Sequence, residues 1–368
     1  MRILELDGLR GIAVMAVIMQ HYLSWLPQIG SENGWLGVDL FFILSGFLIT
    51  SILLNLRTKE HYFSVFYKRR ALRIFPPYYL GILVYLAVSI WAGKTGSVNL
   101  WMQYIFYYTS LQVGQPAALA PNAGVVLIPV QLGLVVLWSL SVEELYYTFW
   151  APIVRYTSHR GFTAILVGMI VAAPLLRWWL HTPEYPELYT FYCRMDALGF
   201  GSVLALLMRA RRDKPAFWQH RDKFFDTAAI VVTLATVALW IYLHGDRSKL
   251  LLSTLGVLMA DTSLALIAFA ILRKSGSQAW WMRALRASWL RSVGMVSYSL
   301  YLFHYPLSFL VRSWVMTWGL SRHAEVITQT LISIVVSFAV AYGLWYGMES
   351  RILNWKDRHV PSPAHPGV

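Results

Sequence analysis

The chain has 368 residues, of which 57% are hydrophobic and 13% are charged. This composition excludes an ordinary soluble enzyme, in which about a quarter of the residues are charged. The net charge of +13 does not indicate nucleic-acid binding, because the basic residues gather in short segments between apolar runs, as they do in membrane proteins.

Apolar runs long enough to cross a bilayer recur along the whole chain. They predict an all-α polytopic membrane protein with about ten transmembrane helices. With the N-terminus in the cytoplasm, basic residues between the spans favour the cytoplasmic side by about four to one, and the C-terminus is cytoplasmic too. We therefore expect a multi-pass protein of the plasma (inner) membrane. The predicted spans lie near residues 9–27, 34–55, 75–93, 138–154, 161–180, 189–208, 224–244, 250–272, 293–315 and 325–348.

Two segments depart from this pattern. Residues 94–137 hold two apolar patches interrupted by Gly and Pro, which predict a re-entrant or extracytoplasmic excursion. Two additional crossings would also satisfy the charge pattern. Residues 355–368 are polar and Pro-rich, and we expect a short cytoplasmic tail without a fixed fold. Residues 1–354 would then form one transmembrane domain.

The first predicted span contains two ionisable residues, Arg10 and His21, which are eleven positions apart. On a helix they lie on one stripe, about 16 Å apart along the axis. An ionisable residue at membrane depth usually has a function, and imidazole can act near neutral pH as a general base or a nucleophile. His21 also fits a histidine that only packs against a neighbouring helix. Arg10 by itself fits an anchor at the membrane edge.

The second span carries one acid, Asp39, near the same outer end as His21. A carboxylate beside an imidazole can orient the ring or stabilise its charged form, so Asp39 is a candidate catalytic residue. Ser45 and Gly46 follow it and predict close contact with another helix. The segment also fits a plain packing face with a polar end.

A basic segment precedes the third span. Arg70 and Arg73 share a helix face because they are three residues apart, and they predict a clamp for the phosphates of a cytosolic ligand. The cluster also fits a basic patch that sets orientation and touches anionic lipid. Phe75 precedes Pro76 and Pro77, so we expect a short interfacial helix to end there and a new span to begin.

The fourth span begins with two adjacent acids, Glu143 and Glu144. They point about 100° apart, so one can face the bundle interior and the other its rim. We take Glu143 as a candidate catalytic acid and Tyr146, three residues later, as a candidate cavity residue. The segment also fits an interfacial helix start, because Ser141 and Glu144 have the spacing of a capping box.

Three further ionisable residues lie inside predicted spans and are candidates for the border of a cavity. Arg194 and Asp196 are expected to form interior ion pairs, with each other or with other helices. A purely structural ion pair is the alternative. His304 is followed by Pro306, and we expect it to shape the cavity at a kink rather than to react. The sequence has no metal-ligand spacing, so we expect no metal.

Together these stretches resemble the membrane acyltransferase-3 family, and the resemblance covers nearly the whole chain. LDGLRGIAVMAVIMQHYL is similar to the opening motif, in which Arg and His are separated by ten residues. LGVDLFFILSGFLIT, RRALRIFPPYYL and WSLSVEELYYTFW look like the next three motifs, and SYSLYLFHYPL like the fifth. Leu145 stands where the family often has Gln, and Phe303 where it often has Trp. The five motifs occur in the family's order.

The resemblance implies an integral O-acyltransferase of bacterial surface glycans, such as cell-envelope polysaccharide or lipopolysaccharide, and of related acceptors. Acetyl-CoA is the expected donor. The expected partners are acyl-CoA, a carbohydrate or glycolipid acceptor and the lipid bilayer, with no nucleic acid.

The resemblance also assigns roles to the candidate residues. Arg70 and Arg73 would bind the donor phosphates, with Arg10 near the entrance. An extended pantetheine arm spans roughly the 16 Å between Arg10 and His21. His21 would be a general base or would first take the acyl group itself, while Asp39 or Glu143 orients its ring.

Other functions stay open at the level of sequence. A proton-coupled transporter also carries Arg, His and acids inside its spans. A scaffold for glycan assembly with a degenerate site would keep the same motifs. Among enzymes, the acceptor can be a small secreted glycoside instead of a surface polysaccharide.

Overall fold

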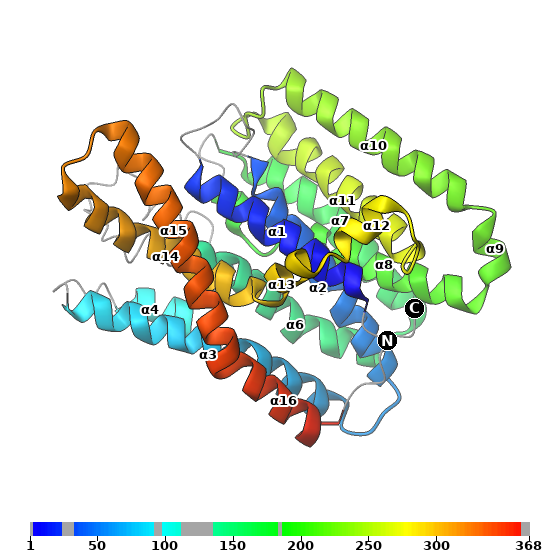
Figure 1. The fold of residues 1–368 in the computed structure, drawn as a ribbon. Helices are drawn as coiled ribbons and strands as arrows, with labels where there is room; N and C mark the ends of the chain where they lie inside the picture. Colours follow the sequence, from blue (N-terminus) through cyan, green and yellow to red (C-terminus); the bar gives the residue numbers. More distant parts are fainter. Residues whose placement is uncertain (1–2, 24–32, 92–97, 112–134, 183–185, 362–368) are drawn as a thin grey trace.

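The computed structural model describes residues 3–23, 33–91, 98–111, 135–182 and 186–361. These residues form helices and turns without a strand, so the all-α prediction is confirmed for this part of the chain (Figure 1). The first half holds α1 (Leu4–Tyr22), α2 (Leu36–Leu56), α3 (Tyr62–Trp91), α4 (Val98–Ile105), α6 (Trp138–Tyr156) and α7 (His159–Leu180), with short 3-10 turns at Thr109–Leu111 and Val135–Leu137.

The second half continues as helices joined by short turns. It holds α8 (Met195–Asp213), α9 (Pro215–Gln219), α10 (Asp222–Tyr242), α11 (Val257–Arg273), α12 (Trp280–Leu285), α13 (Ser288–Met295), α14 (Ser297–Val315), α15 (Arg322–Leu344) and α16 (Ser350–His359), with 3-10 turns at Pro186–Tyr189 and Met316–Trp318. One-turn π-helices, Leu252–Gly256 and Trp345–Glu349, run directly into α11 and α16.

Helix α2 lies at the centre of the bundle and α10 at its periphery (Figure 1). Of the apolar window of α2, 72% is buried by other helices, against 11% in the window that includes α10. A helix whose apolar residues stay uncovered by protein needs lipid around it. The difference is therefore that between an interior helix and a lipid-facing helix of a membrane bundle.

In the part of the chain that the structure describes, five helices are long and apolar enough to cross a bilayer. They are Leu36–Leu56, His159–Leu180, Pro215–Tyr242, Leu252–Arg273 and Arg322–His359. Each of the ten predicted spans coincides largely with a helix, but α1, α3, α6, α8 and α14 carry more polar residues or Pro. The number of ten crossings and the cytoplasmic placement of both termini stay predictions.

Small residues let the central helices touch backbone to backbone. A Cβ on Gly46 of α2 would overlap the Leu198 carbonyl of α8, and one on Gly201 of α8 would overlap the Ile43 carbonyl of α2. The predicted close contact at Gly46 is thus confirmed. Gly294 of α13 approaches the Asp7 carbonyl of α1 in the same way, so α1 is fixed on this side as well.

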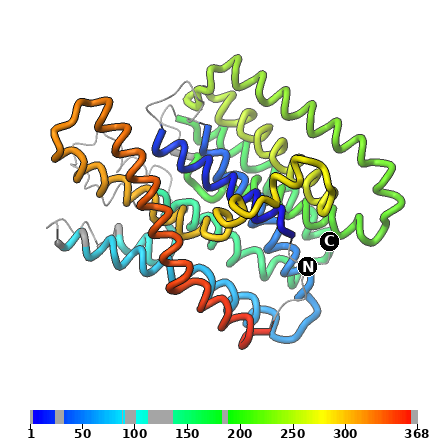
Figure 2. Tube along the Cα trace, viewed as in Figure 1, coloured from blue at the N-terminus to red at the C-terminus, as the bar shows by residue number. Residues whose placement is uncertain are grey.

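The prediction of a break at Phe75 is wrong, because α3 runs through Pro76 and Pro77 without interruption. Proline fixes φ near −65°, a value that a helix accepts, and packing can compensate for the two missing N–H donors. Helix α3 contacts α14 and α16, and the C-terminal helix runs beside it (Figure 2). Tertiary contacts therefore outweigh the local preference of the residue before proline.

One other boundary differs from expectation, and one predicted segment is largely untested. Helix α16 continues to His359, beyond the predicted domain end at residue 354. This end of the chain contacts α3, where Arg69 pairs with Asp357 at 2.5 Å and donates to the Val360 carbonyl at 2.9 Å. Most of the predicted excursion at 94–137 lies outside the described residues, apart from α4 and two short turns.

Candidate active site

A cavity of about 90 Å³ opens between α1, α2, α3, α6 and α14. Its wall combines apolar side chains with a small set of charged and hydroxyl-bearing ones. The polar lining residues are Arg10, Ser45, Arg70, Arg73, Ser139, Glu143, Ser297, Tyr298 and Tyr301. The cavity thus gathers four of the predicted site residues, Arg10, Arg70, Arg73 and Glu143, from three helices.

Positive charge is concentrated on one side of this cavity. Arg10 and Arg70 are half-buried and Arg73 is exposed. Arg10 has one weak ion pair, with Asp7 at 3.9 Å, and the guanidinium of Arg70 lies 4.1 Å from the centre of the Tyr147 ring. Three neighbouring cations repel one another, and the arrangement is suited to a polyanionic ligand.

Glu143 is held in place by two hydroxyl donors. Ser45 of α2 donates to its Oε1 at 2.8 Å, and Tyr147 donates to its Oε2 at 2.8 Å. Arg70 stacks on that same tyrosine, so Tyr147 contacts both the acid Glu143 and the cation Arg70. The sequence analysis did not single out Tyr147 as a site residue, although its i+4 spacing from Glu143 was a usable signal.

Tyr146, the tyrosine predicted to border the cavity, lies elsewhere. It is buried between α6, α2 and α8, where its hydroxyl hydrogen-bonds Ser202 at 2.5 Å and its ring stacks on Trp150. Adjacent residues on a helix point about 100° apart. Of the two tyrosines, Tyr147 therefore turns to Glu143 and Tyr146 to the helix interface.

His21 lies at the end of α1 opposite Arg10, near the middle of α14. Its Nδ1 is 2.8 Å from Nε2 of His304, and the ring of Tyr305 packs against it at a centroid distance of 4.6 Å. His21 is half-buried, whereas His304 is completely buried. Among the described residues, neither Asp39 nor Glu143 hydrogen-bonds the His21 ring.

Tyr301 joins the cavity to this histidine pair. Its ring lines the cavity and its hydroxyl contacts Ser139 at 2.6 Å. Its carbonyl oxygen lies 2.7 Å from Nδ1 of His304. One residue of α14 thus contacts both the cavity and the buried imidazole.

Asp39 belongs to a different cluster, deep between α2, α7, α8 and α11. It forms an ion pair with Arg194, while Asp196 forms one with Arg177 at 2.7 Å. All four side chains are almost fully buried. Pairing of Arg194 and Asp196 with other helices was among the expectations and is observed, with Arg177 of α7 as the partner of Asp196. The four residues are not among those that line the cavity.

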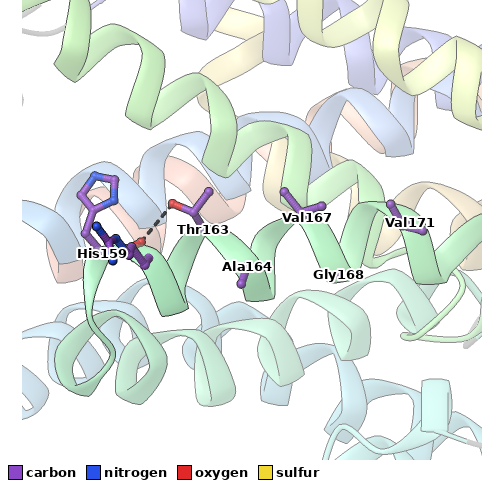
Figure 3. A pocket seen from close by; sticks show the side chains of 7 residues that line it. His159, Thr163, Ala164, Val167, Gly168 and Val171 are labelled. Atoms are coloured by element: carbon purple, nitrogen blue, oxygen red, sulfur yellow. Dashed lines mark hydrogen bonds between the residues drawn. The ribbon is translucent and has the colours of Figure 1, made fainter.

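A second hollow of the described surface has a volume of about 700 Å³ and carries little chemistry. It is an open groove along one helix, α7, lined by His159, Arg160, Thr163, Ala164, Val167, Gly168 and Val171 (Figure 3). The hydroxyl of Thr163 is already bonded to the His159 carbonyl at 3.0 Å. No group of three His, Cys, Asp or Glu within the described segments could hold a metal ion.

Comparison with known proteins gives consistent results. The family described as an acyltransferase domain, Acyl_transf_3, matches residues 3–346. The O-acetyltransferase OatA of Staphylococcus aureus is 26% identical over 92% of this chain and 56% of its own length. The peptidoglycan O-acetyltransferase OatA of Listeria monocytogenes is 26% identical over 82% of the chain and 49% of its own.

The chain therefore spans about half the length of these curated relatives. No solved structure matches it. The family match, by contrast, extends over nearly the whole chain and includes every motif described above. This protein belongs to the membrane acyltransferase-3 family.

Proposed function

We propose that this protein is an integral membrane O-acyltransferase that moves an acyl group, acetyl in the first instance, from cytoplasmic acyl-CoA to a hydroxyl of a carbohydrate at the outer face of the plasma membrane. The observation that carries the proposal is the cavity in which Arg10, Arg70 and Arg73 meet Glu143. The O-acetyltransferases among its relatives support the choice of reaction and of acyl group.

The arginine side of the cavity fits the donor. Coenzyme A carries several phosphates on its nucleotide and has a thin pantetheine arm. Guanidinium groups bind phosphates through paired hydrogen bonds, and exposed Arg73 offers such a group at the mouth. A cavity of about 90 Å³ is too small for a nucleotide but suits a thin chain. The nucleotide would thus stay outside while the arm enters.

His21 is the proposed reacting group, at about 16 Å along α1 from Arg10. In a direct route, its ring takes the proton of the acceptor hydroxyl while the hydroxyl oxygen bonds to the thioester carbon, the C–S bond breaks and CoA leaves as a thiolate. In a covalent route, the ring nitrogen first bonds to that carbon and CoA leaves. The hydroxyl then takes the acyl group, the C–N bond breaks and the hydroxyl proton is released. CoA release without acceptor would distinguish the covalent route.

The acceptor is proposed from chemistry and from relatives. The relative from Listeria monocytogenes is a peptidoglycan O-acetyltransferase, so peptidoglycan is the first acceptor to test. Lipopolysaccharide, exopolysaccharide, a glycolipid and a small secreted glycoside offer the same sugar hydroxyls. The proposed reaction requires only that an acceptor hydroxyl reaches His21 at the end of α1.

A proton-coupled transporter is the second candidate, and the buried ion pairs favour it. Arg194, Asp39, Arg177 and Asp196 place four charges at membrane depth, as proton-coupled carriers often do. The two functions predict different products. Purified enzyme would transfer labelled acetyl from acetyl-CoA to a glycan, whereas a carrier would leave both unchanged.

The deciding experiment compares surface glycans of a deletion strain, a rescued strain and a strain that carries His21→Ala. We expect an acetyl signal in NMR or mass spectra of the rescued strain only, because His21→Ala removes the reacting nitrogen. Western blotting of the variant controls for expression. Three identical spectra would refute the surface-glycan proposal, and the position of a lost signal would name the acceptor.

A further inference from the structure

The ring nitrogen atoms of His304 and His21 take part in a series of hydrogen bonds that has one direction. Nδ1 of His304 lies 2.7 Å from the carbonyl oxygen of Tyr301, and Nε2 of His304 lies 2.8 Å from Nδ1 of His21. A carbonyl oxygen can only accept a hydrogen bond. Nδ1 of His304 must therefore carry a hydrogen. This assignment determines which nitrogen donates and which accepts in the remaining hydrogen bonds.

Burial keeps His304 neutral. Its side chain is completely buried, and the polar groups around its ring in the described segments are the backbone carbonyls of Tyr301 and Leu300 and the His21 ring. A cation here would lack a countercharge, so burial strongly disfavours the protonated ring. A neutral imidazole has one donor and one acceptor nitrogen. Since Nδ1 donates, Nε2 of His304 accepts, and Nδ1 of His21 must donate to it.

The same logic leaves the other nitrogen of His21 with a lone pair. With its hydrogen on Nδ1, a neutral His21 has an unprotonated Nε2. The polar neighbours of the His21 ring within the described segments are Nε2 of His304 and the backbone carbonyl of Val17, one turn earlier on α1. His21 is half-buried where His304 is closed off, so the basic nitrogen lies on the accessible member of the pair.

Neighbouring side chains hold the two rings at this distance. The hydroxyl of Tyr22 donates to the backbone carbonyl of His304 at 2.6 Å and is also paired with Ser337 of α15 at 2.6 Å. Because Tyr22 follows His21 directly, one turn of α1 contacts both the ring and the backbone of His304. This double attachment fixes the position of α1 on α14.

Pro306 adds a second attachment on α14. It has no N–H, which frees the carbonyl of Leu302 four residues earlier. The hydroxyl of Tyr85 on α3 donates to that carbonyl at 3.3 Å. Helix α14 therefore continues through Pro306, and His304 contacts the end of α1.

We propose that His304 is a positioning residue that keeps His21 in the tautomer whose Nε2 is free to react. The proposal rests on the acyl transfer proposed above. When Nε2 of His21 takes a proton or an acyl group, the ring becomes positive. The N–H on Nδ1 then donates more strongly to His304, whose acceptor nitrogen stabilises the charge where no carboxylate of the described residues is in contact.

Two substitutions separate positioning from simple packing. In His304→Gln, the amide oxygen can occupy the place of Nε2 and accept from His21. In His304→Phe, the ring volume is kept but the acceptor is lost. We expect His304→Phe to lower kcat on the order of 10²–10⁴-fold, the range of a catalytic base and of a base held in the wrong tautomer. His304→Gln should retain kcat within about threefold, and KM for acetyl-CoA should change in neither variant.

The tautomer itself gives a readout that does not depend on activity. Protein labelled with 15N-histidine in lipid nanodiscs reports by NMR which ring nitrogen carries the hydrogen, and His21→Ala assigns the signal. We expect the hydrogen on Nδ1 of His21 in the wild type and in His304→Gln, and its redistribution towards Nε2 in His304→Phe. A hydrogen on Nε2 in the wild type would overturn the proposal.

The two proposals can fail separately. If the wild type acylates no glycan but shows Nδ1–H, the proposed function fails while the tautomer assignment stands. If transfer is measured and His304→Phe matches the wild type in kcat and in tautomer, the positioning role is refuted and acyl transfer stands. Should His304→Phe not fold, an NMR spectrum of the wild type together with His304→Gln still decides the assignment.

Discussion

Arg70 supports the cavity through an aromatic ring as well as through its charge. Its guanidinium lies over the face of Tyr147, and the hydroxyl of Tyr147 donates to Glu143. Stacking orients the planar fork, so less conformational freedom is lost when a phosphate binds. Lysine in this position would keep the charge but lose the fork and the stacking.

We predict that Arg70→Ala raises KM for acetyl-CoA by about 10- to 100-fold. A hydrogen bond to a charged group contributes about 1.5–3 kcal/mol, and about 1.4 kcal/mol corresponds to a factor of ten. The measurement is steady-state kinetics on purified protein. Lys68→Ala is the matched control, because Lys68 is an exposed cation on the same helix that does not line the cavity. Equal KM values for the two variants would argue against a phosphate site at Arg70.

Single residues were predictable where local spacing carries the information, and not where partners come from distant helices. Arg70 and Arg73 share a face at i,i+3, and Arg10 was drawn to them by the family resemblance. The partner of His21 was missed, since His304 is 283 positions away and no periodicity relates the two. For His304 itself, the i,i+3 spacing from Tyr301 was a local signal of the hydrogen bond that these two residues form.

Helix contacts depend on where glycines lie rather than on how many there are. Gly46 of α2 and Gly201 of α8 meet at a backbone contact that leaves no room for a methyl group. Gly168 of α7, in contrast, has nothing within 4 Å of the place where a Cβ would stand. Two glycines in apolar helices thus have opposite structural demands.

We predict that Gly46→Ala lowers the thermal stability of the detergent-purified protein, and that Gly168→Ala leaves it equal or slightly higher. Overpacking costs about 1–3 kcal/mol, whereas alanine is favoured over glycine in an open helix by about 0.5–1 kcal/mol. The midpoint of thermal unfolding measures both. Equal midpoints for the two variants would mean that α2 and α8 separate readily.

The helices themselves were largely predictable, because long apolar runs leave few alternatives in a bilayer. Their interruptions were not. The continuity of α3 across Pro76 and Pro77 and the extension of α16 to His359 both depend on contacts with distant helices. Local sequence rules describe the isolated segment and carry no information about such contacts.

At the scale of the molecule, the charge pattern predicts sidedness, and two exposed histidines offer a test. His159 begins α7 at a predicted cytoplasmic turn, and His323 lies in α15 at a predicted outer turn. We expect His323→Cys to react with a membrane-impermeant maleimide in intact spheroplasts, and His159→Cys only after lysis. The single native cysteine, Cys193, is buried, so background labelling should be low. The opposite pattern would reverse the proposed direction of acyl transfer.

The unbroken course of α3 links the two ends of the proposed reaction path mechanically. Arg70 and Arg73 lie towards one end of this helix. Tyr85, which donates to the freed carbonyl of α14, lies three to four turns further on. A rigid helix transmits a small axial shift from one end to the other. Movement of the arginines onto a ligand would therefore displace the attachment of α14 at Tyr85, and with it the imidazole that His21 contacts. Donor binding and the position of His304 relative to His21 would then be coupled through one continuous helix. Two helices separated at Phe75 could not provide this coupling.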